Sequence, residues 1–183
     1  MQKIAKVHHR PIVGVMGSGL DAHRELAEPL GRWLAGEGVH LLTGGGQGVM
    51  AAVSRAFAET PNRQGLVIGV LPLGDDPPYA KDGYPNEWVE IPIRTHLPFS
   101  GPRGQDKMSR NHINILTADV VIALPGGDGT VSEIMLALNY GKAVIAYVAG
   151  EDDIPGLPAA VPTTENLDEV KSFVHAAAEV LGG

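Results

Sequence analysis

The chain has 183 residues, of which 44% are hydrophobic and 19% charged, which suits one globular domain with its own core. It has no cysteine, and this excludes disulfides, thiol nucleophiles and cysteine-bound metal sites. Its formal net charge of -7 argues against nonspecific binding of nucleic acid, because proteins that bind phosphate backbones usually carry an excess of basic residues.

Short apolar runs rich in β-branched residues predict six strands, at 11–17, 39–44, 66–72, 88–93, 118–125 and 143–148. Several runs are continuous rather than alternating, which is typical of strands covered on both faces in a parallel sheet. Helical spacing of apolar residues predicts helices at 21–37, 49–57, 106–117, 130–140 and 167–181. This alternation predicts a Rossmann-like three-layer α/β sandwich with a mainly parallel, doubly wound sheet.

The hydropathy of the chain and its first ten residues predict the cellular compartment of the protein. No apolar run approaches the roughly 18 to 20 residues that span a bilayer. The first ten residues, MQKIAKVHHR, lack the apolar stretch of a signal peptide. We therefore expect a cytoplasmic protein with no membrane partner, in which residues 1–183 form a single domain and residues 1–10 a flexible tail.

Three predicted strands end in glycine-rich turns, namely GSG at 17–19, GGGQG at 44–48 and GGDGT at 126–130. Ligands of open α/β sheets bind beyond the carboxyl ends of the strands, at a switch point in strand order. Amides of such turns and of the helices that follow can converge on one anion, so we expect a phosphate there. The candidate binding residues are Gly17, Ser18, Gly44, Gly45, Gly46, Gly48, Pro125, Gly126, Gly127, Gly129 and Thr130.

The glycine turns also have a structural interpretation, in which they only permit tight packing. The sequence contains neither G-x-G-x-x-G nor a Walker G-K-[ST], so neither a standard dinucleotide fold nor a P-loop ATPase is supported. Its seven histidines show no HExxH pattern and no regular ligand spacing. We expect no metal.

Glu133 has two interpretations. Thr130 and Glu133 have the spacing of a capping box, in which the glutamate would fold back onto the start of its own helix. Alternatively, Glu133 lies one turn inside a helix that binds phosphate and faces the sugar of a nucleotide. Asp128 would repel such a phosphate unless it points away or caps the helix itself.

Arg110 shares one face of a predicted helix with Asn114 and Thr117, opposite an apolar face of Met108, Ile115 and Leu116. Polar helix faces usually meet solvent. This one, however, precedes the strand that ends in the third glycine turn, and a guanidinium suits phosphate or a purine edge.

These residues resemble a known family. GVMGSG, TGGGQGVMAAVS and RNHINILTADVVIALPGGDGTVSE look, in order, like the LONELY GUY (LOG) family and its bacterial relatives, long labelled "possible lysine decarboxylase". The resemblance covers roughly residues 11–148. The signature P-G-G-x-G-T-x-x-E is met by Pro125, Gly126, Gly127, Gly129, Thr130 and Glu133, and Arg110 has the spacing of the family's catalytic arginine.

The resemblance implies a Rossmann-like homodimer or homotetramer with cytokinin-activating nucleoside 5′-monophosphate phosphoribohydrolase activity, which releases a free base and ribose 5-phosphate without a cofactor. It implies that the amides of Gly127, Gly129 and Thr130 hold the phosphate. Glu133 would steady an oxocarbenium-like ribose or activate water, while Arg110 would orient the phosphate or the leaving base.

Two departures raise an alternative. Ser132 stands where cytokinin-releasing members usually carry a glutamate, and GGGQGVM is one residue shorter than their usual loop. In this the chain looks more like a bacterial branch that is also similar to molybdenum-cofactor carrier proteins. The leading hypothesis is therefore a LOG-like hydrolase, and the alternative is a protein that binds or carries a nucleotide or the molybdenum cofactor without turnover.

Overall fold

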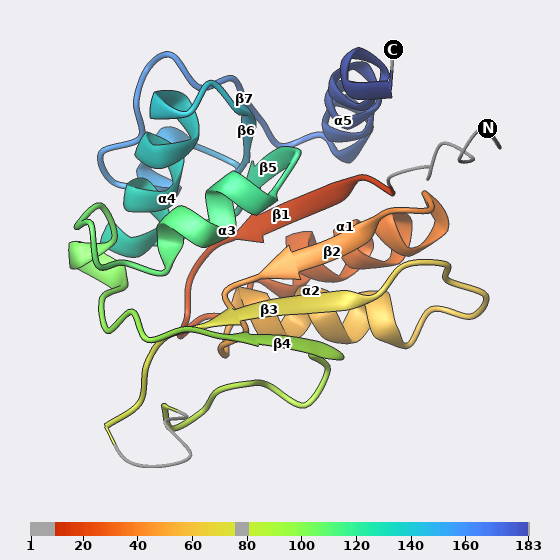
Figure 1. The fold of residues 1–183 in the computed structure, drawn as a ribbon. Helices are drawn as coiled ribbons and strands as arrows, with labels where there is room; N and C mark the ends of the chain where they lie inside the picture. Colours follow the sequence, from red (N-terminus) through yellow and green to blue (C-terminus); the bar gives the residue numbers. More distant parts are fainter. Residues whose placement is uncertain (1–9, 76–80, 183) are drawn as a thin grey trace, which may run out of the picture.

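The computed structural model describes residues 10–75 and 81–182, and its centre is a seven-stranded sheet. All six strand pairings are parallel, and the strand order is β4-β3-β2-β1-β5-β6-β7 (Figure 1). The strands are β1 Ile12–Met16, β2 His40–Thr43, β3 Val67–Leu71, β4 Ile91–Arg94, β5 Val120–Ala123, β6 Ala143–Tyr147 and β7 Thr163–Thr164.

Helices cover both faces of this sheet and make a three-layer sandwich. Apolar side chains of α1 (Arg24–Gly36), α2 (Val49–Ala58) and α5 (Leu167–Gly182) form one core with one face of the strands. Those of α3 (Asn111–Thr117) and α4 (Asp128–Asn139) form a second core with the other face. The predicted Rossmann-like fold is confirmed, in a fully parallel form.

The strand order creates one switch point, between β1 and β5. From β1 the chain moves outward through β2, β3 and β4, and then returns to the other side of β1 to lay down β5. The loops after β1 and β5 therefore leave the sheet toward opposite faces and open a crevice at the carboxyl ends of these strands. β5 is buried at all four positions, as its continuous apolar sequence predicts.

The helix predicted at 106–117 begins five residues later, at Asn111. The preceding residues form turns, in which the Arg110 amide donates to the carbonyl of Phe99. Arg110 and Asn114 are buried, whereas of the predicted apolar face only Ile115 is buried, and Met108 and Leu116 are 44% and 52% exposed. The solvent-facing interpretation of the polar face is therefore wrong, because these polar side chains meet the sheet and its loops.

The remaining differences concern connecting segments. The two-residue strand β7 has no apolar run and was not predicted, and the segment between β6 and β7 contains the short helix η2 (Glu151–Asp153). Most of the predicted tail lies outside the described residues, although Arg10 is described and donates to the carbonyl of Gln64. In the two described stretches, no helix is both long and apolar enough to cross a membrane.

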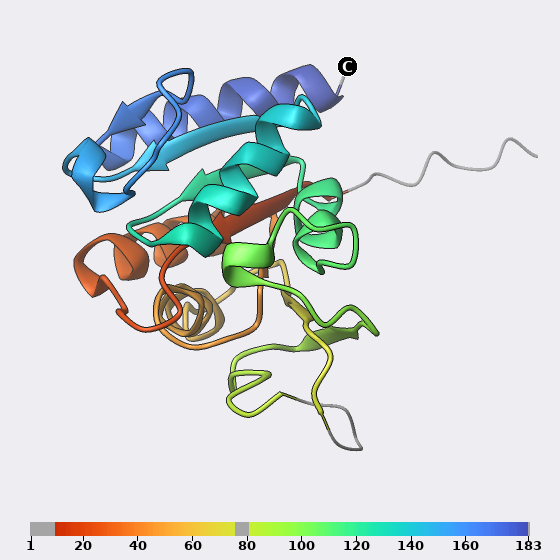
Figure 2. The same cartoon turned by 90° about the vertical axis from the view of Figure 1, so that its left-hand side faces the viewer.

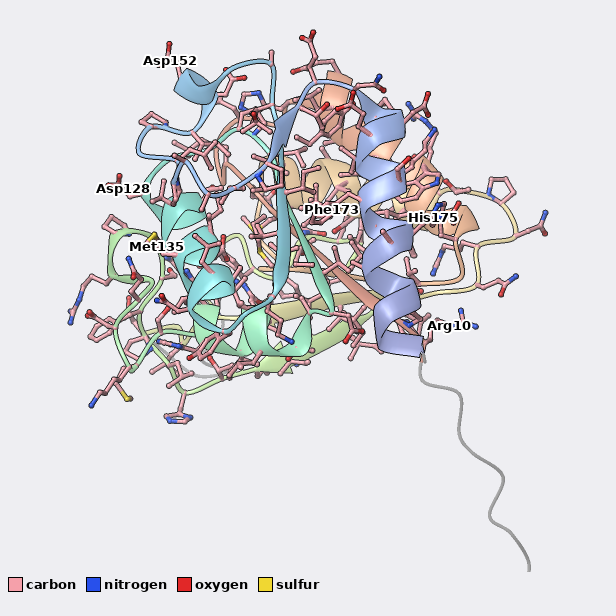
Figure 3. All side chains as sticks on the ribbon, turned by 90° about the horizontal axis from the view of Figure 1, so that it is seen from above. Arg10, Asp128, Met135, Asp152, Phe173 and His175 are labelled. Atoms are coloured by element: carbon pink, nitrogen blue, oxygen red, sulfur yellow. The ribbon has the colours of Figure 1, made fainter. Side chains whose placement is uncertain are left out.

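Outer contacts hold α5 against the sheet and α1 (Figure 3). Val170, Phe173 and Val174 pack into the first core, and His175 Nε2 lies 2.7 Å from Glu37 Oε2 at the end of α1. The carboxyl-terminal helix is therefore part of the same packed unit as α1, α2 and the sheet.

The crossing of α1 and α2 depends on Gly31. A Cβ atom at this position would lie 2.6 Å from the carbonyl oxygen of Val53 and 2.9 Å from Ala56 Cβ. We expect Gly31→Ala to lower the free energy of unfolding by about 1–3 kcal/mol, because α2 must shift to admit the methyl group. Urea denaturation measures this change.

Gly36→Ala is the matched control, since no atom lies within 4 Å of its added methyl group. This variant should keep or gain stability, because alanine favours the helix by up to about 1 kcal/mol. Equal effects of the two substitutions would contradict the packing argument.

Candidate functional site

Backbone hydrogen bonds of Ser18 join the three glycine turns. The Ser18 amide donates to the carbonyl of Pro125 at 2.9 Å, and the Ser18 carbonyl accepts from the amide of Val49 at 2.9 Å. Gly48, at φ +63, lies directly against Ser18 and Gly19, where no side chain would fit. The turns after β1, β2 and β5 therefore meet at one point.

A cavity of about 280 Å³ opens beside this point, at the carboxyl ends of β1 and β5. The predicted residues that line it are Gly17, Ser18, Arg110, Gly127, Gly129, Thr130 and Glu133. Sequence analysis missed the other lining residues, which are Gly19, Leu20, Met50, Tyr84, Ser100, Gly101 and Asn111. Figure 2 shows how the short helix η1 (Gly101–Arg103) comes to lie beside α4.

The other predicted binding residues do not line the cavity, and several of them pack against residues that do. Gly44 lets the guanidinium of Arg110 pack onto the backbone, and Gly46 lies under the ring of Tyr84. Gly126 packs under the Thr130 hydroxyl, and its amide donates to the carbonyl of Asp153 at 3.0 Å. Gly45, Gly48 and Pro125 likewise contact neighbouring chain and do not line the cavity. Contact of this group with a ligand stays a prediction.

The start of α4 has the properties of an anion site. Within the described chain, the amides of Gly127, Asp128 and Gly129 donate to no carbonyl or side chain. The Thr130 amide, in contrast, donates to the carbonyl of Gly127 at 2.9 Å and is already used by the helix. Three free amides at the positive end of a 12-residue helix dipole favour a phosphate or carboxylate.

Asp128 does not obstruct this anion site. Its side chain is exposed, does not line the cavity and makes no capping hydrogen bond (Figure 3). It therefore points away from the candidate anion site, which is one of the two arrangements that the sequence left open.

The structure excludes the capping interpretation of Glu133. The N-cap of α4 is Gly127, so Thr130 is already the third residue of the helix. The Glu133 carboxylate instead accepts a hydrogen bond from Asn114 Nδ2 at 3.1 Å, and the residue is only 7% exposed. Because Glu133 does not cap its helix, its carboxylate is available for chemistry at the cavity.

Burial sets the proton affinity of this carboxyl. Desolvation raises the pKa of Glu133 above its ordinary value of 4.5, and the nearby charge of Arg110 and the hydrogen bond from Asn114 oppose this without cancelling it. A carboxyl group with a raised pKa in a cavity is typical of a functional site.

Arg110 is held from two sides. Its Nη1 donates to the carbonyl of Val70 at the end of β3 at 3.0 Å, and Gly44 packs against its flat guanidinium. The side chain is 4% exposed and lines the same cavity as Glu133. Its positive charge is therefore fixed at the edge of the cavity.

Unsatisfied polar atoms gather around this pair. Among the described residues, four buried side-chain atoms have no hydrogen-bond partner, and three of them are Arg110 Nε, Asn111 Oδ1 and Asn114 Oδ1. Buried polar groups are almost always hydrogen-bonded, so such a cluster indicates a site where a ligand can supply the missing hydrogen bonds. Residues 10–75 and 81–182 contain no group of three or more side chains suited to bind a metal.

Comparison with known proteins places this chain among proteins of related architecture. A family model described as the SLOG cluster4 family matches residues 10–177. The chain belongs to the SLOG cluster4 family. An uncharacterized protein of Archaeoglobus fulgidus is 31% identical to it over 134 residues, which are 72% of this chain and 76% of that protein.

Two solved structures resemble this SLOG cluster4 protein over nearly their whole lengths. One is the molybdenum cofactor binding protein of Rippkaea orientalis, with 33% identity, a TM-score of 0.70 and coverage of 91% of this chain and 98% of that one. The other is the Moco carrier protein of Chlamydomonas reinhardtii, with 29% identity, a TM-score of 0.70 and coverage of 93% and 99%. The expected similarity to molybdenum-cofactor carriers is confirmed.

The raised pKa of Glu133 predicts a pH-dependent stability. The folded protein keeps the Glu133 proton to a higher pH than the unfolded chain, so stability is lost as pH rises above 4.5 through the folded pKa. Glutamine preserves the bond from Asn114 without ionising. We expect Glu133→Gln to be more stable than the parent at pH 7.5, and expect this gain to shrink at pH 4 in urea denaturation.

Glu87→Gln, at an exposed position, controls for the loss of one carboxylate and should show no such pH-dependent gain. A Glu133→Gln variant that is less stable than the parent at pH 7.5 would contradict the burial argument.

Proposed function

We propose that this SLOG cluster4 protein binds the molybdenum cofactor as cargo, through its phosphate, and holds it without converting it. The observation that carries this proposal is the set of three free amides at the start of α4, beside a cavity at the switch point that Gly127 and Gly129 line. The similarity in sequence and fold to a molybdenum cofactor binding protein and a Moco carrier protein supports the choice of cargo.

The two ends of the cargo need different surroundings. The cofactor is a reduced pterin that carries a terminal phosphate monoester, and the monoester suits the amides of Gly127, Asp128 and Gly129. Leu20, Met50 and Tyr84 give the same cavity an apolar and aromatic wall for a flat heterocycle. Leu20 is 92% exposed, and a bound ring would cover part of this side chain.

Ser132 favours a carrier over a cytokinin-releasing enzyme. Its hydroxyl donates to the carbonyl of Gly101 at 3.2 Å, and the residue is 4% exposed. Gly104 lies so close that a Cβ atom there would be 2.6 Å from Ser132 Cβ. The glutamate of the cytokinin-releasing members would have to displace this segment, so the departure at Ser132 is part of the local packing.

The resemblance to the LOG family also bears on assembly and location. We propose that the protein works as a homodimer or homotetramer in the cytoplasm, as that resemblance and the sequence together suggest.

Gly127→Asp tests the anion site. An aspartate at the N-cap position favours the helix, while its charge repels a phosphate at the free amides. We expect the variant to fold as stably as the parent and to bind the cofactor at least about tenfold more weakly. Copurified cofactor, measured as released pterin and as molybdenum per protein, and titration with the isolated cofactor provide the readouts.

Gly150→Asp adds the same charge on an exposed loop and should bind like the parent. Undiminished binding by Gly127→Asp, or a parent protein that neither copurifies with nor takes up the cofactor, would refute the proposal.

A second candidate is a LOG-like phosphoribohydrolase, because Glu133 and Arg110 line the same cavity beside the anion site. In this reaction the bond between C1′ and the base nitrogen breaks and its electron pair leaves with the base. A water oxygen bonds to C1′ and Glu133 takes a proton from this water. The leaving base takes up a proton from solvent, to which Glu133 then releases its own. Arg110 would stabilise the negative charge of the phosphate or of the leaving base.

Incubation with a panel of nucleoside 5′-monophosphates tests this candidate. A hydrolase should release free base, detected by chromatography, and Glu133→Gln should lose at least about a hundredfold in rate. Glu165→Gln, at an exposed position outside both this cavity and the neighbouring one, serves as the control. If the parent releases no base, or if Glu133→Gln is as active as the parent, the hydrolase is excluded and the carrier stands alone.

A further inference from the structure

A second cavity, of about 350 Å³, adjoins the first one. Leu20 lines both cavities. The wall between them is thin, because Gly48 of the second cavity lies directly against the backbone of Ser18, Gly19 and Leu20 of the first. A ligand held by its phosphate at α4 can therefore pass over Leu20 and continue into the second cavity.

The lining of the second cavity suits a flat base. Trp88 is half-buried there and offers an indole for stacking, and Gln47 and Glu87 stand beside it with amide and carboxylate groups. Gln47 Nε2 donates to the carbonyl of Gly83, which leaves its carbonyl oxygen as an acceptor. An aromatic platform with two acceptors matches the amino-bearing edge of a nucleobase.

The charges at this cavity leave one cation available. Glu28 pairs with Arg32 at 3.3 Å, and Arg55 pairs with Glu59 at 3.1 Å. Arg24, the first residue of α1, also lines the cavity and forms no ion pair with any described residue. A guanidinium at this place suits a bridging phosphate.

We propose that the second cavity is a subsite for a nucleotide-type extension of the ligand: a base that stacks on Trp88, joined through a pyrophosphate that Arg24 contacts. The full site would then take a two-headed ligand with one head in each cavity. The high exposure of Leu20 fits this arrangement, since both heads would pack against it. The proposal rests on the proposed phosphate site at α4.

Intrinsic fluorescence distinguishes the two cavities, because the chain has two tryptophans and only Trp88 lines the second one. In a Trp33→Phe protein, we expect diadenosine diphosphate to quench the emission of Trp88 and to bind about tenfold more tightly than ADP. AMP, which reaches only the first cavity, should bind without this quenching.

Variants of Trp88 test the stacking directly by calorimetry. Trp88→Ala should bind diadenosine diphosphate about tenfold more weakly than the parent and AMP equally well, and Trp88→Phe should restore most of the loss. A merely structural role would lower both affinities together. Leu116→Ser, at an exposed leucine outside both cavities, is the control and should bind both probes like the parent.

The outcomes separate the two proposals. If AMP binds but diadenosine diphosphate binds no more tightly than ADP, or leaves Trp88 unquenched, the second subsite is refuted and the phosphate site stands. If none of the three probes binds and the isolated cofactor does not bind either, the phosphate site fails and the extension fails with it.

Discussion

The candidate site depends on the backbone of Ser18. Its amide and its carbonyl tie the turn after β5 and the start of α2 to the turn after β1, which joins three segments that are far apart in the chain. Ser18 can make both bonds only if the turn before α2 packs directly against its backbone, and glycine at position 48 permits that approach. The parallel sheet brings the strand ends together, and these two bonds connect the turns that follow them.

The site holds an energetic conflict beside this junction. Glu133 and Arg110 are both buried, and neither forms a direct ion pair with the other; one accepts from Asn114 and the other donates to Val70. Several polar atoms around them have no partner, which costs stability in a folded protein. Natural folds keep such arrangements where a ligand or a proton supplies the missing interaction, and the cavity beside them gives a place for it.

The fold could be predicted because parallel strands buried on both faces have continuous apolar sequences, and glycine turns mark their ends. Glu133 could not be assigned, because the choice between cap and site depended on whether the N-cap of α4 is Gly127 or Thr130, a shift of three residues. The sequence grouped Arg110 correctly with Asn114, since both are buried, but Arg110 is the N-cap of α3 and not a residue within the helix. Tyr84 and Ser100 reach the cavity from irregular loops, which have no periodic pattern to reveal them.

Gly44 determines where the positive charge of Arg110 lies. Its lack of a side chain makes room for the guanidinium of Arg110 against the backbone, in reach of Val70. Any larger residue there would push this cation off β3 and toward the ligand. Relatives that differ at position 44 should therefore display a relocated positive charge, and with it a changed preference for anions, even where their arginine is the same.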